Sequence, residues 1–558
     1  MKSFLKAILL PAVAMCALTA SSHAQTTFNA IGSSALFLEV GEAAYSNNAA
    51  SCAWSESSKD VVATDTSTGA ALTDSGTAWV VWVPTAGNTC ASNTTPATVY
   101  GYLNTDSVVG NRCLFNSQAG GLCSISYATA AGTSPSGLIE GANEVSLPSA
   151  VASVLTASLV NAAATDIRPE DAEFAITRAL TPCGSTVGGT GSIAPYLGLG
   201  YSNGGSIGSH FSSSKFNVIN FTLPSTYYVQ PVGIDPMIVT VNSTDASGTG
   251  FNASVTNISR AALAGYLDGS IGTTSAAAGK GGAGTPEPTT VILREPLSGT
   301  YNTMEYNIPN TRAFGTSQDV GANQLAGQVN CSGSVPASNP LAIENTTAGS
   351  WRYRAIGTGQ ELSETFATND ALGYAFWGVS NFAAAPATAK YLLVDSIDPI
   401  LTTYHTGVIP TTQAELNGIT FEHILDGSYP IWSLLRLVTV DTTTKGIART
   451  LAIAAAKFSV VGGTTSHPDF VAYYKTNGQI AVDLERSHFA PPGINFPGSN
   501  GIANQPGNGG VSFYGGTGAC TGTEAGGDVG GVSIPIAYAD QNYCTDSGSV
   551  YGILGRRY

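Results

Sequence analysis

One stretch decides the fold expected of this chain: residues 291–301, which read VILREPLSGTY. Its apolar start predicts a buried strand that ends in Arg294, and Ser298-Gly299-Thr300 predicts the first turn of a helix. A helix N-terminus presents unpaired N–H groups and about half a positive charge, so anions bind there. The hydroxyls and the planar guanidinium of Arg294 would add hydrogen-bond donors suited to an oxyanion.

A second stretch with the same construction lies near the start of the chain. Residues 27–36 read TFNAIGSSAL, a strand candidate followed by Gly-Ser-Ser and a helix candidate. Taken singly, either stretch has a simpler interpretation, in which Ser33, Ser34, Ser298 and Thr300 only cap their helices. Two such stretches, far apart in the sequence, are what a clamp between two lobes requires.

Short apolar runs alternate with helical patterns along much of the chain, which is typical of an α/β protein. Leu36, Val40 and Ala44 recur at four-residue intervals and predict the core-facing side of a helix. Strands are predicted at 27–31, 238–241, 291–294, 372–377 and 391–394, and helices at 35–45, 259–266, 443–458 and 469–475. Polar insertions, interpreted as decoration without function, are predicted at about 46–100, 181–215 and 272–287.

The composition excludes one class of partner and leaves another open. Only 11% of the residues are charged and the net charge is −15, whereas nucleic-acid binding needs a basic face. A small anion is not excluded, because a buried site holds its ligand by local hydrogen bonds. The histidines are scattered and no CxxC pair occurs, so we expect no metal site and no cofactor.

The first 24 residues predict export. A basic start precedes an apolar run at 7–18 that is too short to span a bilayer, and Ser22-His23-Ala24 has the small residues that signal peptidase reads. A lipoprotein attached at Cys16 is the alternative. No later run approaches the ~20 apolar residues of a membrane helix. We therefore expect a periplasmic or secreted protein with no direct membrane insertion and no nucleic-acid partner.

Of the nine cysteines, Cys16 would leave with the signal peptide, and the even remainder in an exported chain indicates disulfides. The remaining cysteines are Cys52, Cys90, Cys113, Cys123, Cys183, Cys331, Cys520 and Cys544. The near neighbours Cys113 with Cys123 and Cys520 with Cys544 are the predicted pairs. A bridge between Cys183 and Cys331 stays open, and it would tie two lobes together.

Six further segments occur in the same order as the motifs of a known family: 31–35, 102–110, 164–169, 231–237, 258–269 and 372–377. With the Arg-x-x-x-Ser-Gly-Thr pattern of 294–300, they make the chain resemble the phosphate-binding proteins of ABC phosphate importers. The resemblance implies an α/β, two-lobed type II periplasmic-binding fold. The expected organisation is a signal peptide at 1–24, lobe 1 at 25–230 and 391–475, lobe 2 at 231–390, and a Gly-rich, β-rich C-terminal extension at 476–558.

The resemblance also implies a ligand-binding set contributed by both lobes. Lobe 1 would provide Ser33, Ser34, Ala35, Ser107 and Asp166, and lobe 2 would provide Arg294, Ser298, Gly299 and Thr300. An ionised Asp166 only accepts hydrogen bonds, so it would need a proton on the ligand, which hydrogen phosphate has and sulfate lacks at neutral pH. In a purely structural alternative, Asp166 caps a helix or pairs with Arg168.

The expected function is capture of phosphate or a similar tetrahedral oxyanion, without catalysis, for uptake through an ABC importer permease or for scavenging. One alternative is a secreted phosphatase-like enzyme, although the sequence offers no metal cluster or activated nucleophile. Another is a surface protein that keeps the fold without the ligand. An Arg294 that faces solvent, with no Asp166 opposite, would favour this last alternative.

Overall fold

The structure is a computed structural model. Apart from gaps of one or two residues, it describes residues 26–57, 60–65, 77–115, 123–169, 227–243, 255–274, 287–308, 342–403, 407–459 and 468–479, with short pieces at 172, 221, 224, 251, 318, 324–329, 481, 484–485 and 532–533. The predicted signal peptide and most of the predicted C-terminal extension lie outside these residues. Within the described residues, we find no helix with the length and apolar character that a membrane crossing needs.

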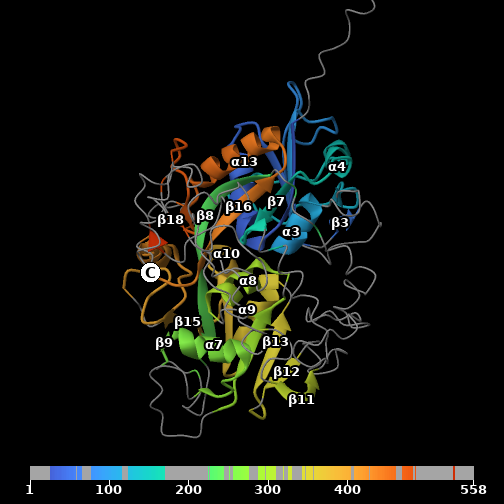
Figure 1. Cartoon of the computed structure of the whole chain (residues 1–558). Coiled ribbons are helices and arrows are strands. Elements are labelled where there is room, and N and C mark those ends of the chain that lie inside the picture. Colours follow the sequence, from blue (N-terminus) through green and yellow to red (C-terminus); the bar gives the residue numbers. More distant parts are fainter. Residues whose placement is uncertain are drawn as a thin grey trace, which may run out of the picture.

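Among the described residues, most strands join one 15-stranded mixed sheet that runs through both halves of the molecule (Figure 1). In the first half, β1 (Thr26–Gly32) lies between β5 (Thr98–Asn104) and β7 (Ala162–Thr165), and all three run parallel. β4 (Ala78–Val83) and β2 (Cys52–Glu56) continue the sheet in antiparallel order to its outer edge.

Both faces of this half are buried. In β4, Val80 and Trp82 contribute to one core, whereas Trp79 and Val81 contribute to another. Successive strand residues point to opposite faces, so a strand between two helix layers is apolar throughout, as β4 is. The first core takes residues from α3 (Ser107–Leu114) and α4 (Ser149–Thr156), and the second takes residues from α2 (Phe37–Ser46) and α13 (Thr442–Ala455).

Residues 46–100, which we expected to be a polar insertion, form part of this sheet. β2, β4 and the start of β5 lie there, and Trp54, Trp79 and Trp82 are buried. Residues 78–83 read AWVVWV, a continuous apolar run typical of a strand that is covered on both faces. The insertion prediction was wrong for this segment, because its polar average concealed that run.

The second half is built around β10 (Thr290–Arg294), which pairs in parallel with β13 (Trp351–Ala355) and β14 (Ala371–Phe376). β12 (Ala342–Asn345) and β11 (Gln324–Val329) extend the sheet in antiparallel order beyond β13. The core of this half takes residues from α7 (Arg260–Asp268), α8 (Gly299–Asn307), α9 (Gly357–Ala367) and α10 (Val379–Phe382).

One long strand connects the two halves. β8 (Tyr228–Asn242) pairs with β16 (Trp432–Thr439) along its first part and with β14 and β15 (Ala389–Val394) along its second. Figure 1 shows β8 running alongside both halves. Residues between 391 and 434, which we assigned to the return into lobe 1, contribute to the core of the second half. The domain boundaries themselves stay predictions.

The mixed sheet confirms the predicted α/β class, and each of the predicted strands lies on a strand of the structure. The helix predicted at 469–475 is wrong, because β17 (Val471–Ala472) pairs there with β8. Tertiary contacts hold this segment extended: the Phe470 ring packs against Gly233, and the Tyr474 hydroxyl accepts a hydrogen bond from Gln230 Nε2 at 2.6 Å. The remaining short elements are η2 (Ser34–Leu36), β3 (Val62–Asp65), β6 (Cys123–Ser126), β9 (Asn257–Ile258), α11 (Gln413–Leu416), α12 (Glu422–Leu425), β18 (Leu484–Glu485) and β19 (Val532–Ser533).

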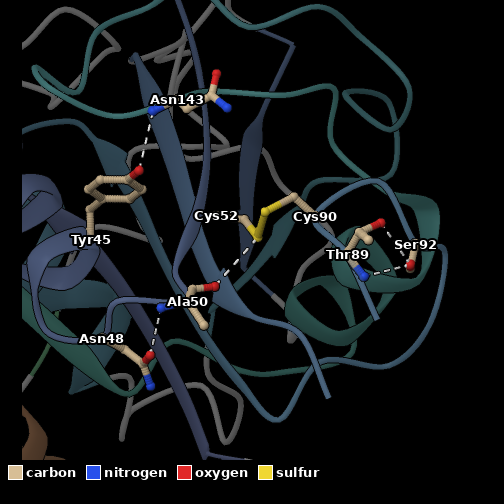
Figure 2. Close-up of a disulfide and its surroundings, with 8 residues drawn as sticks. All are labelled: Tyr45, Asn48, Ala50, Cys52, Thr89, Cys90, Ser92 and Asn143. Atoms are coloured by element: carbon tan, nitrogen blue, oxygen red, sulfur yellow. Dashed lines mark hydrogen bonds between the residues drawn. A yellow bond between two sulfur atoms is a disulfide. The ribbon is translucent and has the colours of Figure 1, made fainter. Parts of the chain in front are cut away.

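Two disulfides lie in the first half. The predicted bridge between Cys113 and Cys123 is confirmed. The bridge between Cys52 and Cys90 joins β2 to the loop after β4, with Cα atoms 5.5 Å apart (Figure 2). It was not predicted, because 38 residues separate its cysteines. The proposed partners Cys183, Cys331, Cys520 and Cys544 lie outside the described residues.

Candidate functional site

Within each half, the residues of the candidate site follow parallel strands whose carboxyl ends lie at one edge of the sheet. β1, β5 and β7 are parallel neighbours, and Ser34, Ser107 and Asp166 come soon after their carboxyl ends. β10 and β13 are parallel neighbours in the other half, where Arg294 ends β10 and Thr358 follows β13. Open α/β sheets bind ligands in the crevice outside the carboxyl ends of their strands. The topology therefore places these residues where a site is expected.

Four of the described helices begin at these residues: η2, α3, α8 and α9. Each N-terminus carries partial positive charge and N–H groups that the helix itself does not use. The start of α3 contacts the start of α8, because the Gly299 backbone lies against the Ser107 side chain, and Figure 1 shows α3 above and to the right of α8. Helix starts from the two halves thus meet at one place.

Two of the serines cap their helices. The Ser33 hydroxyl accepts a hydrogen bond from the Ala35 N–H at 3.1 Å, and the Ser298 hydroxyl accepts one from the Thr300 N–H at 3.1 Å. Ser33 and Ser298 thus cap their helices, and their assignment to a ligand site stays a prediction. The Ala35 N–H, which the resemblance directs at a ligand, is held by Ser33 in this structure.

Asp166 is a buried hydrogen-bond acceptor among these site residues, which we call the cluster. Its side chain is 2% exposed, and Ser107 Oγ donates to its Oδ1. Burial raises the pKa of Asp166, while hydrogen bonds with Ser107 and Ser33 and the charge of Arg294 oppose the rise. The Asp166 carboxyl group therefore lies within hydrogen-bonding reach of serines from two loops, and it interacts electrostatically with the guanidinium of Arg294 in the other half.

Arg294 brings positive charge to the cluster and is 3% exposed. Its Nε and Nη2 donate to the two carboxylate oxygens of Glu295 at 2.9 and 3.0 Å, a bidentate pair. Its Nη1 donates to Thr300 Oγ1 at 3.3 Å and to Thr358 Oγ1 at 2.9 Å. Asp106 lies 3.8 Å from Nη2. Carboxylates thus offset the charge on one side, and Nη1 points to hydroxyls.

The two halves touch at this cluster. The Gly299 backbone lies so close to Asp166 and Ser107 that a Cβ on residue 299 would come within 3.0 Å of both side chains. The Val108 N–H donates to the Leu297 carbonyl at 3.2 Å, again from the first half to the second. Side chains separated widely in the sequence are therefore brought into one buried contact.

Sequence reasoning missed Thr358, Glu295 and Asp106 as members of this cluster. A signal for Thr358 was present, because residues 351–361 read WRYRAIGTGQE, again a strand followed by glycine, a hydroxyl residue and a helix. Glu295 and Asp106 gave no comparable signal. Their place depends on how their side chains meet Arg294, which only the fold determines.

A second set of buried acids lies on α2 and close to β8. Burial raises the pKa of Glu42 to about 8, and the charges of Asp469 and Glu140 add to the rise. Burial, followed by Asp469, also raises the pKa of Glu39 and of Asp235. Carboxyl groups buried together in this way hold their protons to a higher pH than exposed ones do.

Comparison with known proteins gave no matching family model and no matching curated sequence. Among solved structures, the chain is similar to a phosphate ABC transporter substrate-binding protein from Clostridium perfringens with bound phosphate, at 13% identity and a TM-score of 0.25, over 40% of this chain and 65% of that one. It is similar to a phosphate-binding protein from Stenotrophomonas maltophilia at 17% identity and a TM-score of 0.32, over 68% and 85%.

A third similar structure is that of a high-affinity periplasmic phosphate-binding protein called PfluDING, determined with phosphate bound. The identity is 13% and the TM-score is 0.32, over 81% of this chain and 92% of that one. With identities and TM-scores this low, nothing about the ligand of the present chain follows from these likenesses.

Proposed function

We propose that the chain binds phosphate, or a similar tetrahedral oxyanion, at the buried contact between its two halves. One observation carries the proposal: hydroxyls and helix N-termini from both halves, together with Arg294, lie around the buried acceptor Asp166. An oxyanion needs several donors, and a protonated oxyanion also needs one acceptor. The cluster has both.

Binding would replace contacts that the donors now make with one another. Ser107 donates to Asp166, and Arg294 Nη1 donates to Thr300. A tetrahedral anion offers oxygens that can accept from these same groups, while its proton bonds to Asp166. Because the donors come from both halves, the ligand would complete its shell only when the halves close on it.

Selectivity would follow from the count of protons. Asp166 and the anion need one proton between them, and hydrogen phosphate or hydrogen arsenate supplies it at neutral pH. Sulfate supplies none, so it would face a bare carboxylate and be rejected strongly. Because burial raises the pKa of Asp166, lowering the pH protonates that side chain and should relax the rejection of sulfate.

We further propose that the chain is exported to the periplasm or secreted, and that it delivers the anion to an ABC importer permease or scavenges it. The predicted signal peptide and the two disulfides support export, since structural disulfides persist in oxidising compartments. Binding without catalysis is proposed, and phosphate release from a generic ester would test the phosphatase-like alternative. The alternative without a ligand is not supported, because Arg294 is buried and Asp166 lies close enough for their charges to interact.

Isothermal titration with phosphate, arsenate, sulfate and molybdate tests the proposal. We expect phosphate and arsenate to bind and sulfate to be rejected at pH 7. Asp166→Asn should narrow the gap between phosphate and sulfate, and Arg294→Ala should cost several kcal/mol of binding. Arg260→Ala is the matched control, since that arginine makes a surface ion pair and its side chain is 58% exposed. If Arg294→Ala binds phosphate as tightly as the unchanged protein, the proposed oxyanion site is wrong.

A further inference from the structure

The start of α9 is fixed to the charged pair on β10. The Gly357 N–H donates to both carboxylate oxygens of Glu295, at 3.2 and 3.3 Å, and Gly357 has a φ of 74°, which favours glycine. The next residue, Thr358, is 8% exposed. Its Oγ1 lies 2.9 Å from Arg294 Nη1 and 3.4 Å from Ser34 Oγ in the other half. Thr358 thus stands between the guanidinium and the first loop.

The direction of these hydrogen bonds can be argued from chemistry. A guanidinium only donates, so Thr358 Oγ1 must accept from Arg294. The hydroxyl of Thr358 has one proton, and of its two described side-chain partners only Ser34 can accept it. An oxygen that accepts from a cation also becomes a better donor, because bonds in a chain polarise one another. The order is therefore Arg294 to Thr358 to Ser34.

We propose that Thr358 is a positioning residue that turns the Ser34 hydroxyl into a dedicated donor to the bound oxyanion. This inference rests on the proposed function. With one lone pair of its oxygen occupied by Thr358, Ser34 keeps its own proton to donate onward, toward an oxygen that carries no proton. Asp166 would then supply an acceptor of the site, and the chain through Thr358 a donor.

The arrangement would fix the orientation of the anion as well as its affinity. A monoprotonated anion has one oxygen that matches Asp166 and bare oxygens that match Ser34. A diprotonated anion would present a second proton to donors. The chain through Thr358 should therefore favour the monoprotonated over the diprotonated form of phosphate.

The test uses the full chain and isothermal titration with inorganic phosphate across the pH range where phosphate exchanges its second proton. Thr358→Val keeps the shape and removes the hydroxyl, and we expect it to weaken binding roughly tenfold. It should also flatten the preference for the monoprotonated form. Thr358→Ser restores the hydroxyl and should return both properties to near those of the unchanged protein. Ser363→Ala removes an exposed hydroxyl from the same helix and serves as the control.

A double-mutant cycle separates this role from simple support of Arg294. If Thr358 acts through Ser34, Thr358→Val should have little further effect in a Ser34→Ala background. Independent, additive losses would overturn the inference, as would an unchanged dissociation constant or pH profile in Thr358→Val. A failure of the unchanged protein to bind phosphate or arsenate would overturn the proposed function and this inference with it. Phosphate binding with additive losses would overturn the inference alone.

Discussion

Replacing Gly299 with alanine tests whether closure of the two halves is needed for binding. Residue 299 is the first residue of α8, where its backbone faces Asp166 and Ser107. An added Cβ would come within 3.0 Å of both side chains, whereas ordinary contact begins at 3.4 Å. The halves, or the two side chains, would have to move by about 1 Å to restore ordinary contact. Either movement displaces the acceptor from the donors.

The size of the effect follows from the cost of overpacking. Inserting a methyl group into a filled contact typically costs about 1–3 kcal/mol, which corresponds to roughly 5- to 150-fold in a dissociation constant. This cost applies to the closed form, while alanine itself is the better helix former by about 0.4–1 kcal/mol. Binding should therefore weaken even if the thermal stability of the fold changes little.

Isothermal titration with phosphate and a thermal melt of each variant give the two quantities. Gly446→Ala is a matched control, because that exposed glycine lies within α13 and an added Cβ would meet nothing within 4 Å. We expect Gly446→Ala to keep the wild-type dissociation constant and to raise the melting temperature slightly. If Gly299→Ala binds phosphate as tightly as the unchanged protein, the contact between the halves is not part of the site and the reasoning fails.

Three further predictions concern stability and rates. Glu42 has a pKa of about 8 in the folded protein, so it keeps a proton that the unfolded chain releases. The free energy of unfolding should therefore fall between about pH 5 and 8. In urea melts, Glu42→Gln should remove up to about 5 kcal/mol of that loss at pH 8 and none at pH 4.5. The Cys52→Ser/Cys90→Ser variant removes a bridge between cysteines 38 residues apart and should lose about 4 kcal/mol of stability. The Cys113→Ser/Cys123→Ser variant removes a bridge between cysteines 10 residues apart and should lose about 3 kcal/mol. Equal losses would contradict the loop-entropy reasoning. The net charge of −15 repels an arriving anion, so stopped-flow association with phosphate should speed up with added salt while dissociation stays constant.

Elements that carry their own signal could be predicted from the sequence. In the strand at 290–294, residues 291–293 are apolar and Arg294 ends the strand, and Ser298 is a strong capping residue. The residues of this segment therefore predict the strand, the turn and the start of α8 without help from distant parts of the sequence. The segment at 469–475 shows where this fails. A helix was predicted there, yet the partners of its aromatic residues lie on β8, far away in the sequence, and those contacts decided the conformation.

The same distinction applies to the candidate site. Ser107, Asp166 and Gly299 belong to local motifs, and the structure brings them together as the order of those motifs implied. Thr358 belongs to the cluster because β13 pairs with β10, a parallel pairing across an intervening stretch that the sequence alone did not specify. Glu295 was visible in the sequence beside Arg294, but only the two hydrogen bonds between their side chains show that Glu295 offsets the positive charge.

The charges around Arg294 explain how an acidic chain could hold an anion selectively. Glu295 forms a bidentate pair with the guanidinium, and Asp106 lies nearby. Burial raises the pKa of Glu361 to about 8, with Arg294 opposing the rise, so Glu361 carries a proton at neutral pH and adds little negative charge. With the guanidinium charge largely offset, Arg294 would act on an anion mainly through its Nη1 hydrogen-bond donor, beside the N–H and O–H dipoles of the helix starts. A net positive charge favours any anion according to the total charge of that anion. Fixed hydrogen-bond donors and acceptors also distinguish which of its oxygens carry protons. The paired state of Arg294 therefore makes proton-dependent recognition the expected behaviour of this site.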